Sequence, residues 1–317
     1  MSFISVLFAL LLEQARPLAR GNPVHATMRV WVRWCARNFD AGKPLHGWLA
    51  WTAAVGLPSL LAAAIYVLLD VTVSWALAMF WSALVLYTCL GFRQFSFHFT
   101  QIRDALAVDD EPLAKSLLCQ WQHIEPQNWT RSELLGRVIQ FSVLASHRHV
   151  LGVLVWFSVF AGLGLGPMGA VLYRLGEFVV RYWQHQSQMH AQPVSEALQN
   201  HAKLAWHWID WVPARVTALS FAVVGNFEEA IDGWRAYQAS SAPSNDGLLL
   251  AATAGAVNLA LPGLAVNLPT SPDDTDPTRA KPTLELAHLA IVVGLVWRAV
   301  VMWVVLLALL TLARLLG

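Results

Sequence analysis

The residues best suited to chemistry lie in one short segment, residues 208–215, which reads WIDWVPAR. It places a carboxylate, Asp210, and a guanidinium, Arg215, on either side of Pro213, among large apolar side chains. Such charges are costly inside a membrane unless they are paired or hydrated. Two interpretations stay open. Either the two charges form an ion pair that stabilises a helix break at Pro213, or Arg215 binds an anionic group that Asp210 orients.

Other polar residues could complete an anion-binding site. Arg148 stands between two histidines, and its planar guanidinium suits a carboxylate or a phosphate. The two histidines are two positions apart, so they face different sides of a helix and do not predict a metal site. Asn226 and Glu228 follow the WIDWVPAR segment closely enough to join it. No phosphate loop, dinucleotide fingerprint or nucleophile elbow is present in the sequence.

The composition indicates an integral membrane protein. Of the 317 residues, 56% are hydrophobic and 13% are charged, with 16 tryptophans, whereas soluble domains carry about 25% charged residues. The net charge of +1 gives no reason to expect a nucleic-acid partner, so the expected partner is the lipid bilayer. The three cysteines show no CxxC spacing, which argues against a disulfide framework.

Apolar runs predict the elements that must position these residues. Residues 48–69, 71–91 and 289–312 read as membrane helices, the first two as a tight hairpin. A fourth run, 150–175, is interrupted by a glycine-rich stretch that ends at Pro167. It is either one broken span or a re-entrant pair of short helices, and we favour the pair. The predicted fold is all-α and polytopic, with three to five membrane segments and a cytoplasmic or interfacial helical layer.

The domain organisation follows from the same pattern. We expect a membrane domain over residues 1–265, a flexible linker over 266–285 that is rich in proline and aspartate, and a C-terminal transmembrane helix over 286–317. Basic residues concentrate in the stretches 13–46 and 92–149, which predicts that both face the cytoplasm.

Several blocks of the chain resemble the CobD/CbiB family. Residues 210–218, DWVPARVTA, resemble the family segment NWIPARLTA, and residues 169–174, GAVLYR, resemble its GALAYRA element. A third block begins at Asn245. The resemblance implies a bacterial inner-membrane protein that joins aminopropanol or its phosphate to a corrinoid carboxylate at the expense of ATP. It adds Tyr173, Arg174 and Asn245 to the candidate ligand-binding residues.

The departures from the family pattern shape the functional prediction. The acidic, amide-rich block of the synthases is replaced here by residues 141–149, FSVLASHRH, which contain no carboxylate. We therefore predict an AmpE-like, non-synthase member that binds an anionic small molecule or a membrane-protein partner in envelope signalling. On this hypothesis the protein is not an enzyme and needs no cofactor. The alternatives are an active adenosylcobinamide-phosphate synthase, which would use ATP and Mg²⁺, and a ligand-free membrane scaffold.

Overall fold

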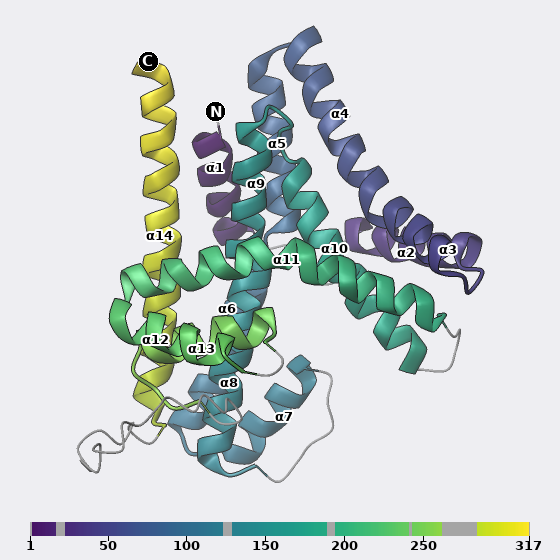
Figure 1. Cartoon of the computed structure of the whole chain (residues 1–317). Coiled ribbons are helices and arrows are strands. Elements are labelled where there is room, and N and C mark those ends of the chain that lie inside the picture. Colours follow the sequence, from purple (N-terminus) through teal and green to yellow (C-terminus); the bar gives the residue numbers. More distant parts are fainter. Residues whose placement is uncertain are drawn as a thin grey trace. The chain divides into compact units, whose positions relative to one another are not determined.

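The computed structural model describes residues 2–16, 23–122, 129–188, 194–240, 243–261 and 284–316, and no strand occurs among them. The elements are shown in Figure 1. In chain order they are α1 (Ser2–Ala15), α2 (Pro23–Phe39), α3 (Pro44–Trp51), the π-helical turn η1 (Thr52–Gly56), α4 (Leu57–Thr72), α5 (Trp75–Cys89), α6 (Phe92–Ala107), α7 (Glu111–Gln122), α8 (Arg131–Ser146), the π-helical turn η2 (His147–Leu151), α9 (Gly152–Gly162), α10 (Met168–Gln188), α11 (Glu196–Val224), α12 (Phe227–Gln238), α13 (Asn245–Ala256) and α14 (Leu286–Leu316).

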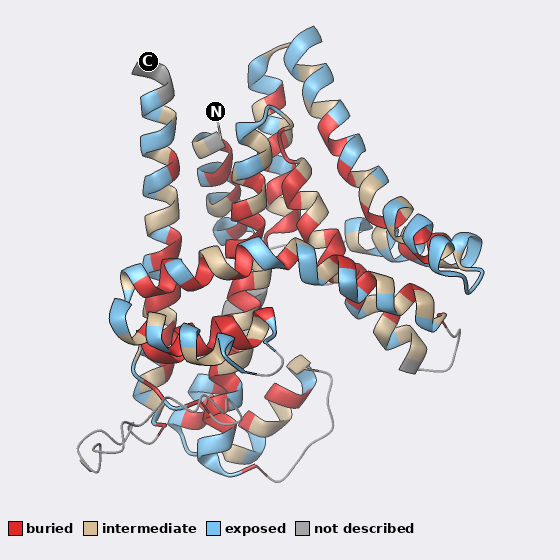
Figure 2. Cartoon of the chain, viewed as in Figure 1, coloured by how far each residue is buried: buried red, intermediate tan, exposed pale blue. Residues whose placement is uncertain are grey.

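The structure confirms an all-α membrane protein. Among the described residues, three helical stretches are long and apolar enough to cross a bilayer, namely Pro44–Thr72, Arg131–Gly162 and Leu286–Ala313. In the first and last of these, 28% and 33% of the residues in an apolar 18-residue segment are buried, whereas 61% are buried in the corresponding segment of Arg131–Gly162. In Figure 2 most of α4 is exposed, in agreement with the low burial of Pro44–Thr72. The exposed apolar faces of α4 and α14 are therefore the surfaces suited to lipid.

The predicted hairpin over residues 48–91 forms as α4 and α5. Ser74 ends the short turn by capping α5, because its Oγ accepts a hydrogen bond from the Leu77 N–H at 3.4 Å. The Trp81 indole donates to the Ala62 carbonyl at 3.1 Å, which joins the two helices. The second arm is shorter than predicted: α5 has 15 residues, fewer than the roughly 20 of a full span.

The glycine-rich stretch turns the chain back on itself. Gly164 and Gly166 have φ angles of +79° and +57°, a conformation that side chains other than glycine rarely adopt. Helices α9 and α10 then run side by side in opposite directions, since Gly169 lies against the Trp156 carbonyl and Gly152 against the Tyr173 ring. Residues 150–175 are thus a helical hairpin rather than one broken span. Its first arm is longer than predicted, because α9 continues α8 through η2.

The chain divides into two compact units. Unit 1 comprises Met1–Gly91, Arg148–Pro213 and Val304–Gly317, and unit 2 comprises Phe92–His147 and Ala214–Trp303. One boundary between the two units, after Pro213, falls within α11, and this helix is continuous through Pro213. The predicted helix break at this proline is therefore wrong. The predicted linker lies outside the described residues, except for its last two positions.

Each unit has its own packing. In unit 1, α10 and α11 pack with α2, α3 and η1 around a buried apolar cluster that includes Trp183 and Leu198. In unit 2, α12 and α13 approach closely because Gly233 and Gly255 each lie against a main-chain carbonyl of the other helix, at Ala251 and Glu229 respectively. A side chain at either glycine would collide with that backbone.

Candidate functional site

The eight predicted site residues fall into two sets, one in each unit. Unit 1 holds Arg148, Tyr173, Arg174 and Asp210, and unit 2 holds Arg215, Asn226, Glu228 and Asn245. Asp210 and Arg215 thus belong to different sets.

A buried hydrogen bond between Tyr173 and Asp210 forms the centre of the first set. The Tyr173 hydroxyl of α10 donates to Asp210 Oδ1 of α11 at 2.8 Å, and the two residues are 0% and 1% exposed. Burial raises the pKa of Tyr173 well above its usual value, and the charge of Asp210 raises it further. The phenol therefore stays protonated and keeps donating to the carboxylate.

Three neighbours fix the geometry of that pair. Gly152 of α9 lies under the Tyr173 ring so closely that an added Cβ would sit 2.3 Å from the ring atom Cζ. The Trp206 ring packs against Tyr173 at 5.0 Å between centroids. The Trp156 indole donates to the main-chain carbonyl of Ile209, the residue before Asp210, at 2.9 Å. Helices α9, α10 and α11 therefore position the pair jointly.

Glu177 is a buried acid shared between two arginines on one face of α10. Its Oε2 lies 2.5 Å from Arg174 Nη1 and its Oε1 lies 2.7 Å from Arg181 Nε. Burial alone would raise the pKa of Glu177, but the charges of Arg181 and Arg174 outweigh it and lower that pKa to about 2. The sequence prediction missed Glu177 and Arg181. Their spacing from Arg174, i+3 and i+7, is the helical signal that could have identified them.

Histidines from two other elements border this charged group. His149 of η2 has a buried Nδ1 with no hydrogen-bond partner among the described residues. On α2, burial lowers the pKa of His25, and Arg174 and Arg29 lower it further. His25 is therefore biased towards its neutral form.

Four guanidinium groups act in or beside the first set, those of Arg29, Arg148, Arg174 and Arg181, together with the carboxylates of Glu177 and Asp210. Arg29 and Arg181 are exposed, whereas Arg148 and Arg174 are half-buried. A guanidinium group can bind a carboxylate or a phosphate through two parallel hydrogen bonds.

Three of the four residues of the second set, Asn226, Glu228 and Asn245, lie at the N-terminal ends of α12 and α13. Arg215 Nη1 donates to Asn245 Oδ1 at 3.3 Å, and Asn245 is the buried first residue of α13. Asn226 is exposed and caps α12, its Oδ1 accepting from the Glu229 N–H at 3.4 Å. Glu228 is exposed in the first turn of α12. The structure thus gives Asn226 a capping role and brings Arg215 together with Asn245.

The carboxylates of the first set do not match the requirements of Mg²⁺. This ion is usually held by one or two carboxylates together with substrate phosphates. No group of three His, Cys, Asp or Glu residues that could hold a metal occurs within the part of the chain that the structure describes. Asp210 and Glu177 already serve Tyr173 and the arginines. The set does not fit a protein-built metal site.

Comparison with known proteins gives a consistent result. A family model described as CobD/Cbib protein matches residues 4–296. The chain is similar to the "Cobalamin biosynthesis protein CobD" of Stutzerimonas stutzeri, with 28% identity over 319 residues and 96% of each chain covered. It is also similar to the protein of the same name from Chromobacterium violaceum, with 28% identity over 183 residues, 56% of this chain and 54% of that one. No solved structure matches.

Proposed function

The chain belongs to the CobD/CbiB family, and we propose that it is a membrane-bound amide synthase of cobalamin biosynthesis. The observation that carries the proposal is the match to a relative named for that pathway along 96% of both chains. The guanidinium group of Arg148, whose charge acts on Tyr173, supports it, because the corrinoid carboxylate, ATP and aminopropanol phosphate are all anionic.

The AmpE-like, non-synthase hypothesis is wrong. It rested on the absence of carboxylates from residues 141–149. Both relatives are named for cobalamin biosynthesis, and neither points to envelope signalling. The acids of the first set instead stand outside that block, since Glu177 lies on α10 and Asp210 on α11. A missing local block is a weak argument when helices from distant parts of the chain supply the carboxylates.

The residues of the first set can be given roles in amide formation. A carboxylate reacts with an amine only after one of its oxygens becomes a better leaving group, which ATP provides by phosphorylation. Arg148 would hold the carboxylate and phosphate oxygens and stabilise the charge that develops on them. Asp210, held by Tyr173 at 2.8 Å, would accept the proton that the attacking amine loses.

Genetic complementation tests this proposal. The gene is expressed in a bacterial strain that lacks its own corrinoid amide synthase and is grown without supplied cobinamide. The wild type should restore growth and Arg148→Ala should not, whereas Arg235→Ala should, because Arg235 is 77% exposed in unit 2. Failure of the wild type to restore growth, with the protein present in the membrane fraction, would refute the synthase function and leave a scaffold.

We propose in addition that the protein lies in the bacterial inner membrane with its main basic loops in the cytoplasm. The basic residues of 13–46 and 92–149 support this orientation. A cysteine placed at exposed Ser132 tests it, against a background in which Cys35, Cys89 and Cys119 are all buried. Ser132→Cys should resist a membrane-impermeant maleimide in intact spheroplasts and react after lysis. Labelling from the periplasmic side would reverse the orientation.

A further inference from the structure

Unit 1 contains an apolar cavity of about 240 Å³ between α2, α4, α5 and α10. We propose that it binds one acyl chain of an anionic phospholipid, whose phosphate group lies on Arg174. The proposal concerns a lipid-binding site and does not depend on the synthase activity.

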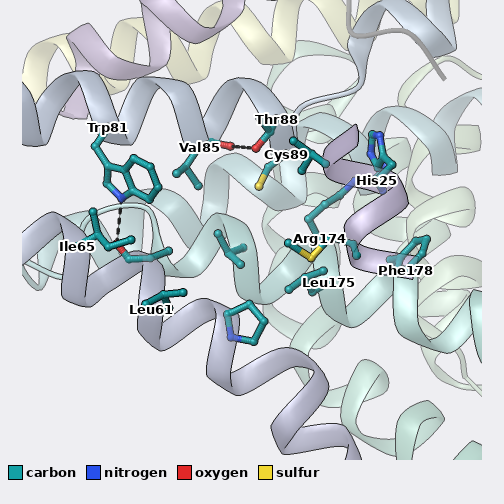
Figure 3. Close-up of a pocket in the computed structure, with 15 residues that line it drawn as sticks. His25, Leu61, Ile65, Trp81, Val85, Thr88, Cys89, Arg174, Leu175 and Phe178 are labelled. Carbon is teal, nitrogen blue, oxygen red and sulfur yellow. Dashed lines mark hydrogen bonds between the residues drawn. The ribbon is translucent and has the colours of Figure 1, made fainter. Parts of the chain in front are cut away.

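The cavity has an apolar body and a polar end. Its body is lined by side chains such as Leu61, Ile65 and Val85, and its exposed polar surface is small beside its apolar surface. Figure 3 shows Trp81 and Ile65 at one end and His25, Thr88 and Arg174 at the other. Trp81 and Thr88 are two helical turns apart on α5, which corresponds to roughly 10 Å. An amphiphile matches this distribution along its length.

The volume favours a slender ligand. Sites for drug-sized molecules usually enclose about 300–1,000 Å³, more than the 240 Å³ found here. A corrinoid ring system is too broad for such a space, and a free phosphate would leave the apolar body empty. A single alkyl chain fills it and removes apolar surface from water, which is favourable.

Arg174 can receive the phosphate without losing its present partner. Its Nη1 bonds to Glu177, and a guanidinium carries five N–H donors in all. Glu177 is shared with Arg181, so the three side chains together carry an excess positive charge. His25 is biased towards its neutral form and can still offer a hydrogen bond to a phosphate oxygen.

The surroundings are those of a membrane interface. Helix α4 belongs to the span Pro44–Thr72 and exposes Leu57, Leu60 and Leu61. Helix α2 is amphipathic: it carries Arg29, Arg33 and Arg37 and also exposes apolar side chains such as Val30 and Trp34, which are 65% and 47% exposed. Helices of this kind lie among lipid headgroups, and their basic residues attract anionic lipids.

Native mass spectrometry of the purified full-length protein tests the proposal. The protein in detergent is titrated with phosphatidylglycerol, with phosphatidylcholine or with inorganic phosphate. We expect one tightly held phosphatidylglycerol per chain and clearly weaker retention of phosphatidylcholine. Excess inorganic phosphate should leave the lipid bound. Displacement by phosphate would instead show a free-anion site, and equal retention of both lipids would refute the selection of an anionic headgroup.

Variants that fill the cavity provide the structural control. Ala62→Phe, from α4, and Val85→Phe, from α5, should each reduce phosphatidylglycerol binding at least about tenfold, the effect of excluding a few methylene groups. Leu60→Phe is the matched control, because Leu60 is on α4, is 56% exposed and does not line the cavity. Unchanged binding in both cavity variants would refute the proposal.

A measurement on the wild type keeps the proposal testable if those variants fail to fold. Cys89 lines the cavity, whereas Cys35 is buried outside it. Phosphatidylglycerol should slow alkylation of Cys89 by a hydrophobic maleimide and leave the rate at Cys35 unchanged. Equal rates at Cys89 with and without the lipid would show that the cavity is not occupied.

Discussion

The Trp156 indole replaces the hydrogen bond that Pro213 removes from α11. Proline has no N–H, so in a helix it leaves the carbonyl four residues earlier without its donor. Here that carbonyl belongs to Ile209, and Trp156 Nε1 donates to it at 2.9 Å. The helix therefore continues past Pro213, and Asp210, the next residue after Ile209, stays aligned with Tyr173.

Trp156→Phe should reduce the free energy of unfolding by about 1–3 kcal/mol, because the Ile209 carbonyl loses its donor in a partly buried place. Thermal unfolding in detergent measures the effect. The control is the same substitution in a Pro213→Ala background, where the new backbone N–H can bond to Ile209. An equal loss in both backgrounds would contradict the replacement of one hydrogen bond by the other.

Gly152→Ala should separate Tyr173 from Asp210, because the added Cβ would lie 2.3 Å from the ring. We expect a lower melting temperature together with loss of complementation. Gly162→Ala, at the other end of α9, is the matched control, since nothing lies within 4 Å of its Cβ position. A Gly152→Ala protein that folds and complements like the wild type would show that this contact does not hold the pair.

Glu177 predicts a specific dependence of stability on pH. Its pKa falls from 4.5 to about 2 in the folded protein, so its contribution is fully present above pH 4.5 and disappears as the pH falls towards 2. The difference corresponds to about 3 kcal/mol. Glu177→Gln should be less stable than the wild type at neutral pH, and the two should converge near pH 2.

Melting temperatures across that pH range check this prediction. Glu228→Gln removes an exposed carboxylate and is the control for the loss of one negative charge. A gap between wild type and Glu177→Gln that stays constant down to pH 2 would show that the ion pairs of Glu177 with Arg174 and Arg181 do not stabilise the fold.

Tyr173→Phe removes the hydroxyl that holds Asp210 and should lower synthase activity about 100-fold, the usual scale for a misplaced proton acceptor. Complementation and amide formation in membranes provide the measurements. Tyr182→Phe is a suitable control on the same helix, because the Tyr182 hydroxyl bonds to Arg33 instead. Full activity in Tyr173→Phe would exclude the Tyr173–Asp210 pair from the reaction.

Arg215→Ala distinguishes ligand binding from stabilisation in unit 2. The substitution removes a hydrogen bond of 3.3 Å to Asn245, a length at which such bonds are weak. If Arg215 binds substrate, complementation should be lost with little change in melting temperature. A sharp drop in melting temperature would assign Arg215 a structural role.

Patterns that depend on near neighbours were readable from the sequence. The apolar runs predicted the hairpin of α4 and α5 and the final span, and the glycine-rich stretch predicted the turn between α9 and α10. Arg174, Glu177 and Arg181 are also spaced so that they share one face of a helix, although the sequence prediction did not include Glu177 or Arg181. Helix periodicity and membrane length are local properties, so the sequence alone determines them.

Pairs between distant segments required the tertiary structure. Tyr173 and Asp210 are 37 residues apart and Trp156 and Ile209 are 53 apart, and no periodicity links either pair. The proline was misread for the same reason: whether a helix ends at proline depends on whether another element supplies the missing donor. The sequence alone therefore determined the membrane fold and the family resemblance. Only long-range packing decided that α11 is continuous and that Asp210 pairs with Tyr173.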